Sequence, residues 1–206
     1  CDVVLIVSPS GQFLSSEDLD LMDRITSKEG IRELYLVASQ VDNQLYGSEK
    51  TNGNGILNKV LDGIEDKLTE QQRGVLSSLK QQYPDIKNTF DTLIENKVIL
   101  SSGISYNMMK SFENQRLWDE NMKKVWENLN FHYKDFFTDK DTAILNLKKL
   151  ANIEVIQKII DDVRNKKDAI LARRKEEFIK AKYKALLEYK ESLEQDIKNQ
   201  IQKITT

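Results

Sequence analysis

Two short polar segments each follow an apolar run that is typical of a buried strand. Residues 39–42 follow the run at 34–38, and residues 101–103 follow the run at 98–100. Ligands of open parallel sheets bind outside the carboxyl ends of the strands, so we expect the two segments to be neighbours. A carboxylate only accepts hydrogen bonds. Asp42 can therefore accept from the N1–H and the exocyclic amine of a guanine, a pair of donors that adenine does not offer.

Backbone N–H groups of the second segment can meet the guanine carbonyl oxygen, which completes a guanine-specific pocket. The candidate base-binding residues are Ser39, Gln40, Asp42, Ser101, Ser102 and Gly103. We predict no catalytic residue and no metal ligand in this chain.

Other residues that carry chemistry are sparse. Cys1 is the only cysteine, which excludes an intrachain disulfide framework and a cysteine-based zinc site and fits a reducing compartment. His132 is the only histidine and lies among aromatic residues, so we interpret it as a packing residue. Ser8 and Ser10 lie outside any G-x-S-x-G pattern, which disfavours a nucleophile.

Composition limits the function classes. The 206 residues include 31 Lys and Arg against 33 Asp and Glu, a net charge of -2 that argues against a basic nucleic-acid binder. Only 8 Gly and 2 Pro argue against a turn-rich all-β fold. No window approaches the roughly 18 apolar residues of a membrane-spanning helix.

The first part of the chain reads as a strand, a helix and a strand. Val3–Val7 is a β-branched run, and Ser15 with Asp18 has the spacing of a capping box before a helix that Gly30 stops. The run at 34–38 then completes a βαβ unit, and the run at 98–100 adds a third parallel strand. The fold class is therefore a partial α/β parallel sheet in a predominantly helical chain.

Helical patterns fill the rest of the sequence. An insertion at about 44–97 carries helices over 57–79, which Pro84 ends, and over 86–94. A stripe from Trp118 to Leu129 and a helix over 144–150, capped by Thr138 with Asp141, follow the third strand.

The last fifty residues read as one or two long helices. No Pro or Gly occurs between Ile153 and Ile204, and a nearly heptad apolar stripe lapses at Lys167 and Arg174, where we expect a bend or a change of partner. Residues 164–190 hold ten Lys and Arg against four acids, a net charge of +6. A solvated helix face explains these charges better than an anionic membrane or a nucleic acid.

Three stretches resemble parts of known GTPases. DVVLIVSPSGQFLSSEDLDLMDRI with ELYLVASQVD resembles the second half of a GTPase domain, up to the guanine motif N/T-K-x-D. Asp42 matches the Asp of that motif, Ser39 stands where Asn or Thr is usual, and Gln40 replaces the Lys. VILSSG is similar to the last guanine-contact motif. LANIEVIQKIIDDVRNKKDAILARRKEEF resembles the helix that leads from a dynamin-like G domain into its stalk, so the overall resemblance is to bacterial dynamin-like GTPases of the LeoA type.

The resemblance implies GTP or GDP with Mg²⁺ in a complete protein. The sequence contains no G-x-x-x-x-G-K-[ST] phosphate loop, so we expect a fragment that binds no cofactor and hydrolyses no GTP alone. The implied organisation is a partial G domain over 1–151 and a stalk helix over 152–206. Without its upstream part, we expect unpaired strand edges to promote aggregation. Gln40 is shorter than Lys and neutral, so we expect weak nucleotide binding.

Two functions remain open at this point. The first is the base-recognition half of a dynamin-like, membrane-remodelling GTP-binding protein. Such a protein would be cytoplasmic or peripherally bound to membranes or vesicles. Its partners would be the remainder of its own G domain and bundle, further copies of itself and a membrane surface, but no nucleic acid. The second is a non-enzymatic helical interaction module with a coiled-coil arm. A receiver-like domain is disfavoured because no acidic cluster suited to Mg²⁺ follows a strand.

Overall fold

The computed structural model describes residues 3–26, 33–82, 90–91 and 94–205. The chain divides into two compact units, residues 1–159 and residues 160–206. Among the described residues, no helix is both long enough and apolar enough to cross a membrane.

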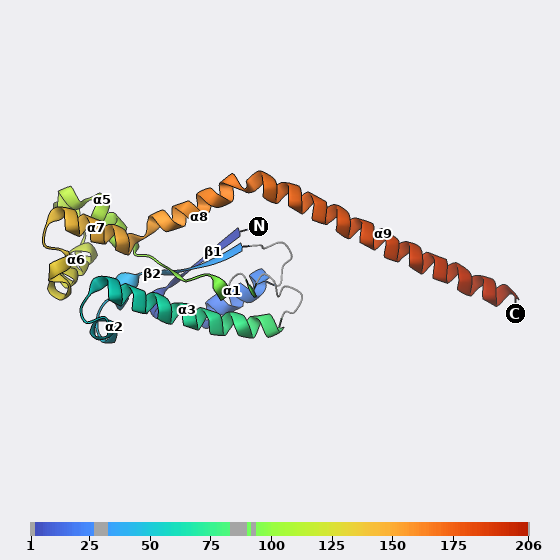
Figure 1. The fold of residues 1–206 in the computed structure, drawn as a ribbon, viewed down its shortest axis with the longest axis horizontal. Coiled ribbons are helices and arrows are strands. Elements are labelled where there is room, and N and C mark those ends of the chain that lie inside the picture. The colour runs from blue at the N-terminus through green and yellow to red at the C-terminus, as the bar shows by residue number, and fades with distance from the viewer. Residues whose placement is uncertain (1–2, 27–32, 83–89, 92–93, 206) are drawn as a thin grey trace. The chain divides into compact units, whose positions relative to one another are not determined.

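A small parallel sheet forms the centre of the first unit (Figure 1). Its strands β1 (Val3–Pro9), β2 (Glu33–Ser39) and β3 (Ile99–Leu100) lie in the order β1-β2-β3. β1 pairs with β2 along its whole length, whereas β2 pairs with β3 only at two positions. The three strands expected from the sequence are therefore confirmed, in a mostly helical chain.

Helix α1 (Ser16–Thr26) connects β1 with β2 and begins at the predicted capping box. The Asp18 N–H donates to Ser15 Oγ at 3.4 Å, and the Ser15 N–H donates to Asp18 Oδ2 at 3.0 Å. Asp18 Oδ2 also accepts from Ser8 Oγ at 2.6 Å, which ties the helix start to the end of β1. Gly30, the predicted stop of this helix, lies outside the described residues.

Helices α2 (Ser48–Asn52) and α3 (Leu57–Gln82) form most of the insertion, and α3 runs along the sheet (Figure 1). The buried side chains of α3 lie on one face of the helix, as the sequence predicts; they are Leu57, Val60, Ile64, Leu68, Thr69, Gln72, Leu76 and Leu79. Two of them are polar and bond to the segment before β3. Thr69 Oγ1 accepts from the Val98 N–H at 3.1 Å, and Gln72 Nε2 donates to the Asn96 carbonyl at 2.7 Å. Pro84 and most of the predicted helix over 86–94 lie outside the described residues.

A group of helices follows β3 and lies at the carboxyl ends of the strands. It comprises α5 (Gly103–Lys110), α6 (Glu120–His132) and α7 (Lys140–Ala151). Short 3₁₀ helices occupy Ser10–Gln12, Val41–Gln44, Phe112–Leu117 and Lys134–Phe136. The predicted cap of α7 by Thr138 with Asp141 is wrong, because Asp139 is the N-cap and its Oδ1 accepts from the Thr142 N–H at 2.9 Å.

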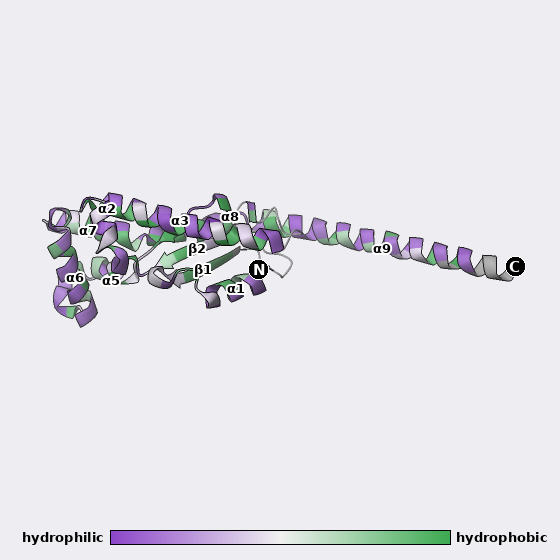
Figure 2. Cartoon of the chain, turned by 90° about the horizontal axis from the view of Figure 1, so that it is seen from below, coloured by the Kyte–Doolittle hydropathy of each residue, from purple (hydrophilic) through white to green (hydrophobic). Residues whose placement is uncertain are grey.

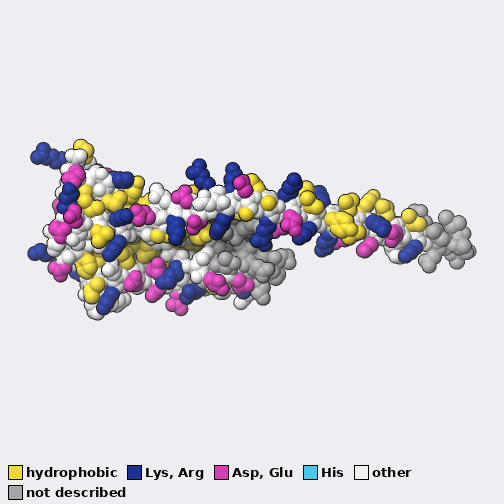
Figure 3. Space-filling model, turned by 45° about the horizontal axis from the view of Figure 1, so that its top comes forward, with side chains coloured by type: hydrophobic (Ala, Val, Ile, Leu, Met, Phe, Trp, Pro, Cys, Tyr) yellow, Lys and Arg dark blue, Asp and Glu magenta, His cyan; other side chains and the backbone are white. Residues whose placement is uncertain are grey.

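Helix α8 (Ile153–Asn165) follows α7, and α9 (Lys167–Thr205) forms most of the second unit. Lys166 lies between the two helices, next to the predicted lapse at Lys167, whereas α9 passes through Arg174 without interruption. Polar and apolar residues alternate along α9 (Figure 2), and its described side chains are almost all exposed. Large apolar side chains appear at intervals on its surface (Figure 3); those with the most exposure are Phe178, Ile179, Tyr183, Leu186, Tyr189 and Ile197.

Asn152 joins the end of α7 to the sheet, and its replacement tests that link. It has a φ of 49° at the C-cap of α7, and its Nδ2 donates to the Leu100 carbonyl at 2.9 Å. We expect Asn152→Ala to lower the free energy of unfolding by about 2 kcal/mol, through left-handed backbone strain and the lost hydrogen bond. Asn152→Gly tolerates the backbone and loses only the bond, so it should cost about 1 kcal/mol. Urea unfolding measures the free energy of unfolding of both variants. Equal decreases in the two variants would show that backbone strain does not contribute.

Candidate functional site

The two polar segments meet at the end of the sheet. Gln40 has a left-handed backbone, with a φ of 56°, and this turn directs the chain from β2 into the 3₁₀ helix that contains Asp42. The Val41 N–H donates to the Ser101 carbonyl at 3.1 Å, and the Ser101 N–H donates to the Ala38 carbonyl at 2.9 Å. Backbone hydrogen bonds thus hold residues 40–42 directly against residues 101–103.

Asp42 is a buried carboxylate with a fixed orientation. Ser102 Oγ donates to Asp42 Oδ1 at 2.6 Å, and the exposed fractions of the two side chains are 0% for Ser102 and 5% for Asp42. Ser102 Oγ in turn lies 2.9 Å from Ser105 Oγ and accepts from the Ser105 N–H at 3.2 Å. Hydrogen bonds to a charged acceptor are short and strong. Asp42 Oδ2 accepts no hydrogen bond from the described residues, so it can accept from a ligand.

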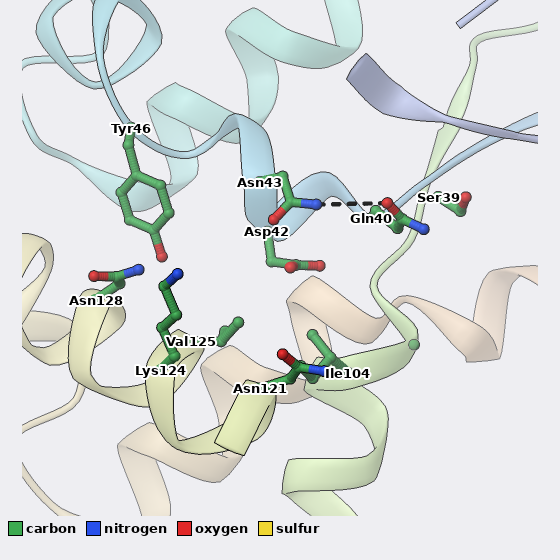
Figure 4. A pocket seen from close by; sticks show the side chains of 11 residues that line it. Ser39, Gln40, Asp42, Asn43, Tyr46, Ile104, Asn121, Lys124, Val125 and Asn128 are labelled. Atoms are coloured by element: carbon green, nitrogen blue, oxygen red, sulfur yellow. Dashed lines mark hydrogen bonds between the residues drawn. The ribbon is translucent and has the colours of Figure 1, made fainter. Parts of the chain in front are cut away.

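A pocket of about 610 Å³ opens in front of this carboxylate (Figure 4). Its volume lies within the roughly 300–1,000 Å³ of small-molecule sites. The lining residues are Ser39, Gln40, Asp42, Asn43, Tyr46, Gly103, Ile104, Asn121, Lys124, Val125 and Asn128.

Four of the six candidate residues line the pocket, and the other two support it. Ser39, Gln40, Asp42 and Gly103 are in the lining, and Ser102 holds Asp42 from behind. Ser101 Oγ donates instead to the Ala151 carbonyl at 2.8 Å, which fixes the end of α7. Gly103 begins α5, and the N–H groups of Gly103 and Ile104 have no intrahelical acceptor, whereas the Ser105 N–H donates to Ser102 Oγ, so the first two remain available at the pocket.

Helix α6 forms the opposite wall, which the sequence interpretation missed. Asn121, Lys124, Val125 and Asn128 have the i, i+3, i+4, i+7 spacing of one helix face. This mostly polar stripe was visible in the sequence beside the apolar stripe of the same helix, but a polar stripe is usually a solvated face. Only the packing of α6 shows that it faces the pocket.

Tyr46 was also missed, and its hydroxyl is the most unusual polar group at the site. The Tyr46 Oη is buried and makes no hydrogen bond within the described part of the chain. Burial, then the negative charge of Asp42, then Tyr133 raise the pKa of the Tyr46 phenol above its ordinary value. The phenol therefore stays protonated near neutral pH and can donate a hydrogen bond to a ligand.

His132 packs beside the pocket, in agreement with its interpretation from sequence. Its ring lies 4.9 Å from the ring of Tyr46 and 4.9 Å from that of Phe131, as measured between centroids. Its Nδ1 lies 3.2 Å from Lys50 Nζ. Across residues 3–26, 33–82, 90–91 and 94–205, no three His, Cys, Asp or Glu side chains gather as a metal site.

Comparison of the chain with models of protein families, with curated proteins and with solved structures found no match.

Proposed function

We propose that the pocket binds the base of a guanine nucleotide, and that this chain does so alone, in place of the expectation from the resemblance that it binds no cofactor by itself. The observation that carries this proposal is the buried Asp42 carboxylate, which Ser102 orients at 2.6 Å while its second oxygen remains available. The free N–H groups at the start of α5 lie on the same pocket and offer donors to a carbonyl oxygen. This combination of acceptors and donors complements the hydrogen-bonding edge of guanine and mismatches that of adenine.

Base selectivity tests the proposal. We expect GMP to bind the chain at least about tenfold more tightly than AMP or IMP, measured by isothermal titration calorimetry, because each of these bases lacks at least one donor for Asp42. IMP is the sharper comparison, since hypoxanthine differs from guanine only by the exocyclic amine. Equal affinity for the three nucleotides would refute guanine recognition.

The resemblance to dynamin-like GTPases extends the proposal to a larger assembly. In it, this chain supplies base recognition and a stalk helix, while Mg²⁺ binding and the hydrolysis of GTP belong to other parts of a complete protein. Membrane remodelling, contact with a membrane surface and a cytoplasmic location follow from that resemblance alone.

A second candidate function is a helical interaction module, and α9 favours it. It carries large apolar side chains that are exposed, and such a stripe is typical of helices that join a bundle. No binding of any nucleotide, together with self-association that depends on α9, would favour this function over the first.

A further inference from the structure

The wall of the pocket formed by α6 carries donors that base recognition does not use. The Lys124 ammonium, the Tyr46 hydroxyl and the Asn128 amide lie at one end of the pocket, and the first two point toward each other (Figure 4). Asp42 lies between this end and Gln40 (Figure 4). The pocket therefore has an acceptor at Asp42 and a group of donors beside it.

We propose that Lys124, Tyr46 and Asn128 form a subsite for an anionic group of the ligand, which we identify as the phosphate of a nucleotide. This inference rests on the proposed function, because it concerns the ligand whose base lies on Asp42. The inference adds that α6 contacts the ligand. It also adds that Lys124 supplies a positive charge to the site, where Gln40 replaces the Lys of the guanine motif.

The first argument concerns Lys124, which has three donors and no acceptor. Its neighbour Lys123 donates to Glu120 Oε1 at 2.8 Å, whereas Lys124 forms no ion pair with any described residue and lies on the pocket. Among the described residues that line the pocket, Asp42 is the only acidic one. An anionic group would be repelled by Asp42 and attracted by Lys124, so we expect it to bind in the part of the pocket that α6 lines.

The second argument concerns the Tyr46 hydroxyl. A buried hydroxyl without a partner destabilises the protein, because it has lost its hydrogen bonds to water. A ligand oxygen at this end of the pocket would accept the missing bond. The Asn128 amide lies at the same end and offers further N–H donors to the same group (Figure 4).

The contribution of a phosphate tests the subsite. The full chain is titrated calorimetrically with guanosine, GMP and AMP, and the same ligands are applied to Lys124→Gln, Tyr46→Phe and the control Lys123→Gln. We expect GMP to bind about fivefold more tightly than guanosine, the scale of an exposed ionic contact. Lys124→Gln should remove this difference and Tyr46→Phe should reduce it, whereas Lys123→Gln should preserve it.

The outcomes separate this inference from guanine recognition. Equal affinities of the wild type for guanosine and GMP would overturn the phosphate subsite and leave base recognition intact. The same conclusion would follow if Lys124→Gln bound GMP more tightly than guanosine by the same factor as the wild type does. Equal weakening of guanosine and GMP by Lys124→Gln would also overturn the subsite, because Lys124 would then contact the nucleoside. AMP that binds as tightly as GMP, with the same dependence on Lys124, would support the subsite and refute guanine recognition. Failure of all three ligands to bind would refute both.

Discussion

Asp42→Asn is expected to weaken GMP binding by about 1.5–3 kcal/mol, or roughly 10- to 150-fold. The Asn side chain keeps one acceptor oxygen, which can still accept from Ser102 Oγ and preserve the local fold. Its amide nitrogen replaces the second carboxylate oxygen and presents N–H groups to the donors of guanine. Calorimetric titration of GMP into the wild type and the variant measures the loss.

Two controls accompany Asp42→Asn. Ser102→Ala leaves the carboxylate but removes the hydrogen bond that orients it, so we expect a smaller loss of GMP affinity, about fivefold. AMP serves as the ligand control, since an adenine offers Asp42 no matching pair of donors. Retention of wild-type GMP affinity in Asp42→Asn, or equal losses for GMP and AMP, would show that Asp42 does not recognise the base.

Trp118→Ala is expected to lower the free energy of unfolding by about 3–5 kcal/mol. The indole is 3% exposed, and its ring meets those of Phe112 and Trp126 edge to face, at centroid distances of 5.9 and 5.6 Å. Its Nε1–H donates to Ser111 Oγ at 2.9 Å. Truncation leaves a cavity in this aromatic cluster and removes one hydrogen bond to Ser111 Oγ, which still donates to the Asn107 carbonyl at 2.7 Å. Urea unfolding followed by circular dichroism measures the change.

Trp118→Ala should also affect the pocket, because Trp118 lies two residues before α6 and packs against Trp126 of that helix. We therefore expect the difference in affinity between GMP and guanosine to be smaller in Trp118→Ala than in the wild type. Trp118→Phe keeps an aromatic ring and should cost less. Phe131→Ala, at a side chain of α6 that is 82% exposed, should change the stability by less than about 0.5 kcal/mol. Equal costs for Trp118→Ala and Phe131→Ala would contradict the structural role of the cluster.

Local sequence patterns determined the elements of the fold and one side of the site. The apolar runs predicted all three strands, and Ser15 with Asp18 predicted the start of α1 because a capping box is a local interaction. The run at Val3–Val7 did not show that β1 lies at an edge of the described sheet, where Val7 is 61% exposed. The neighbouring positions of residues 39–42 and 101–103 followed from parallel pairing alone. The cap of α7 was misplaced by one residue, since Thr138, Asp139 and Asp141 all have side chains that can cap a helix.

Tertiary structure alone decided the other side of the site. No local pattern distinguishes the stripe at Asn121, Lys124 and Asn128 from a solvated helix face, because polar residues occur in both. The orientation of this stripe toward the pocket depends on the packing of α6, which includes the contact between Trp118 and Trp126. The hydroxyls of Ser101 and Ser102 are adjacent in sequence, yet one bonds to Ala151 and the other to Asp42. These partners lie 50 and 60 residues away, so their pairing depends on how the helices close over the sheet, which no local pattern encodes.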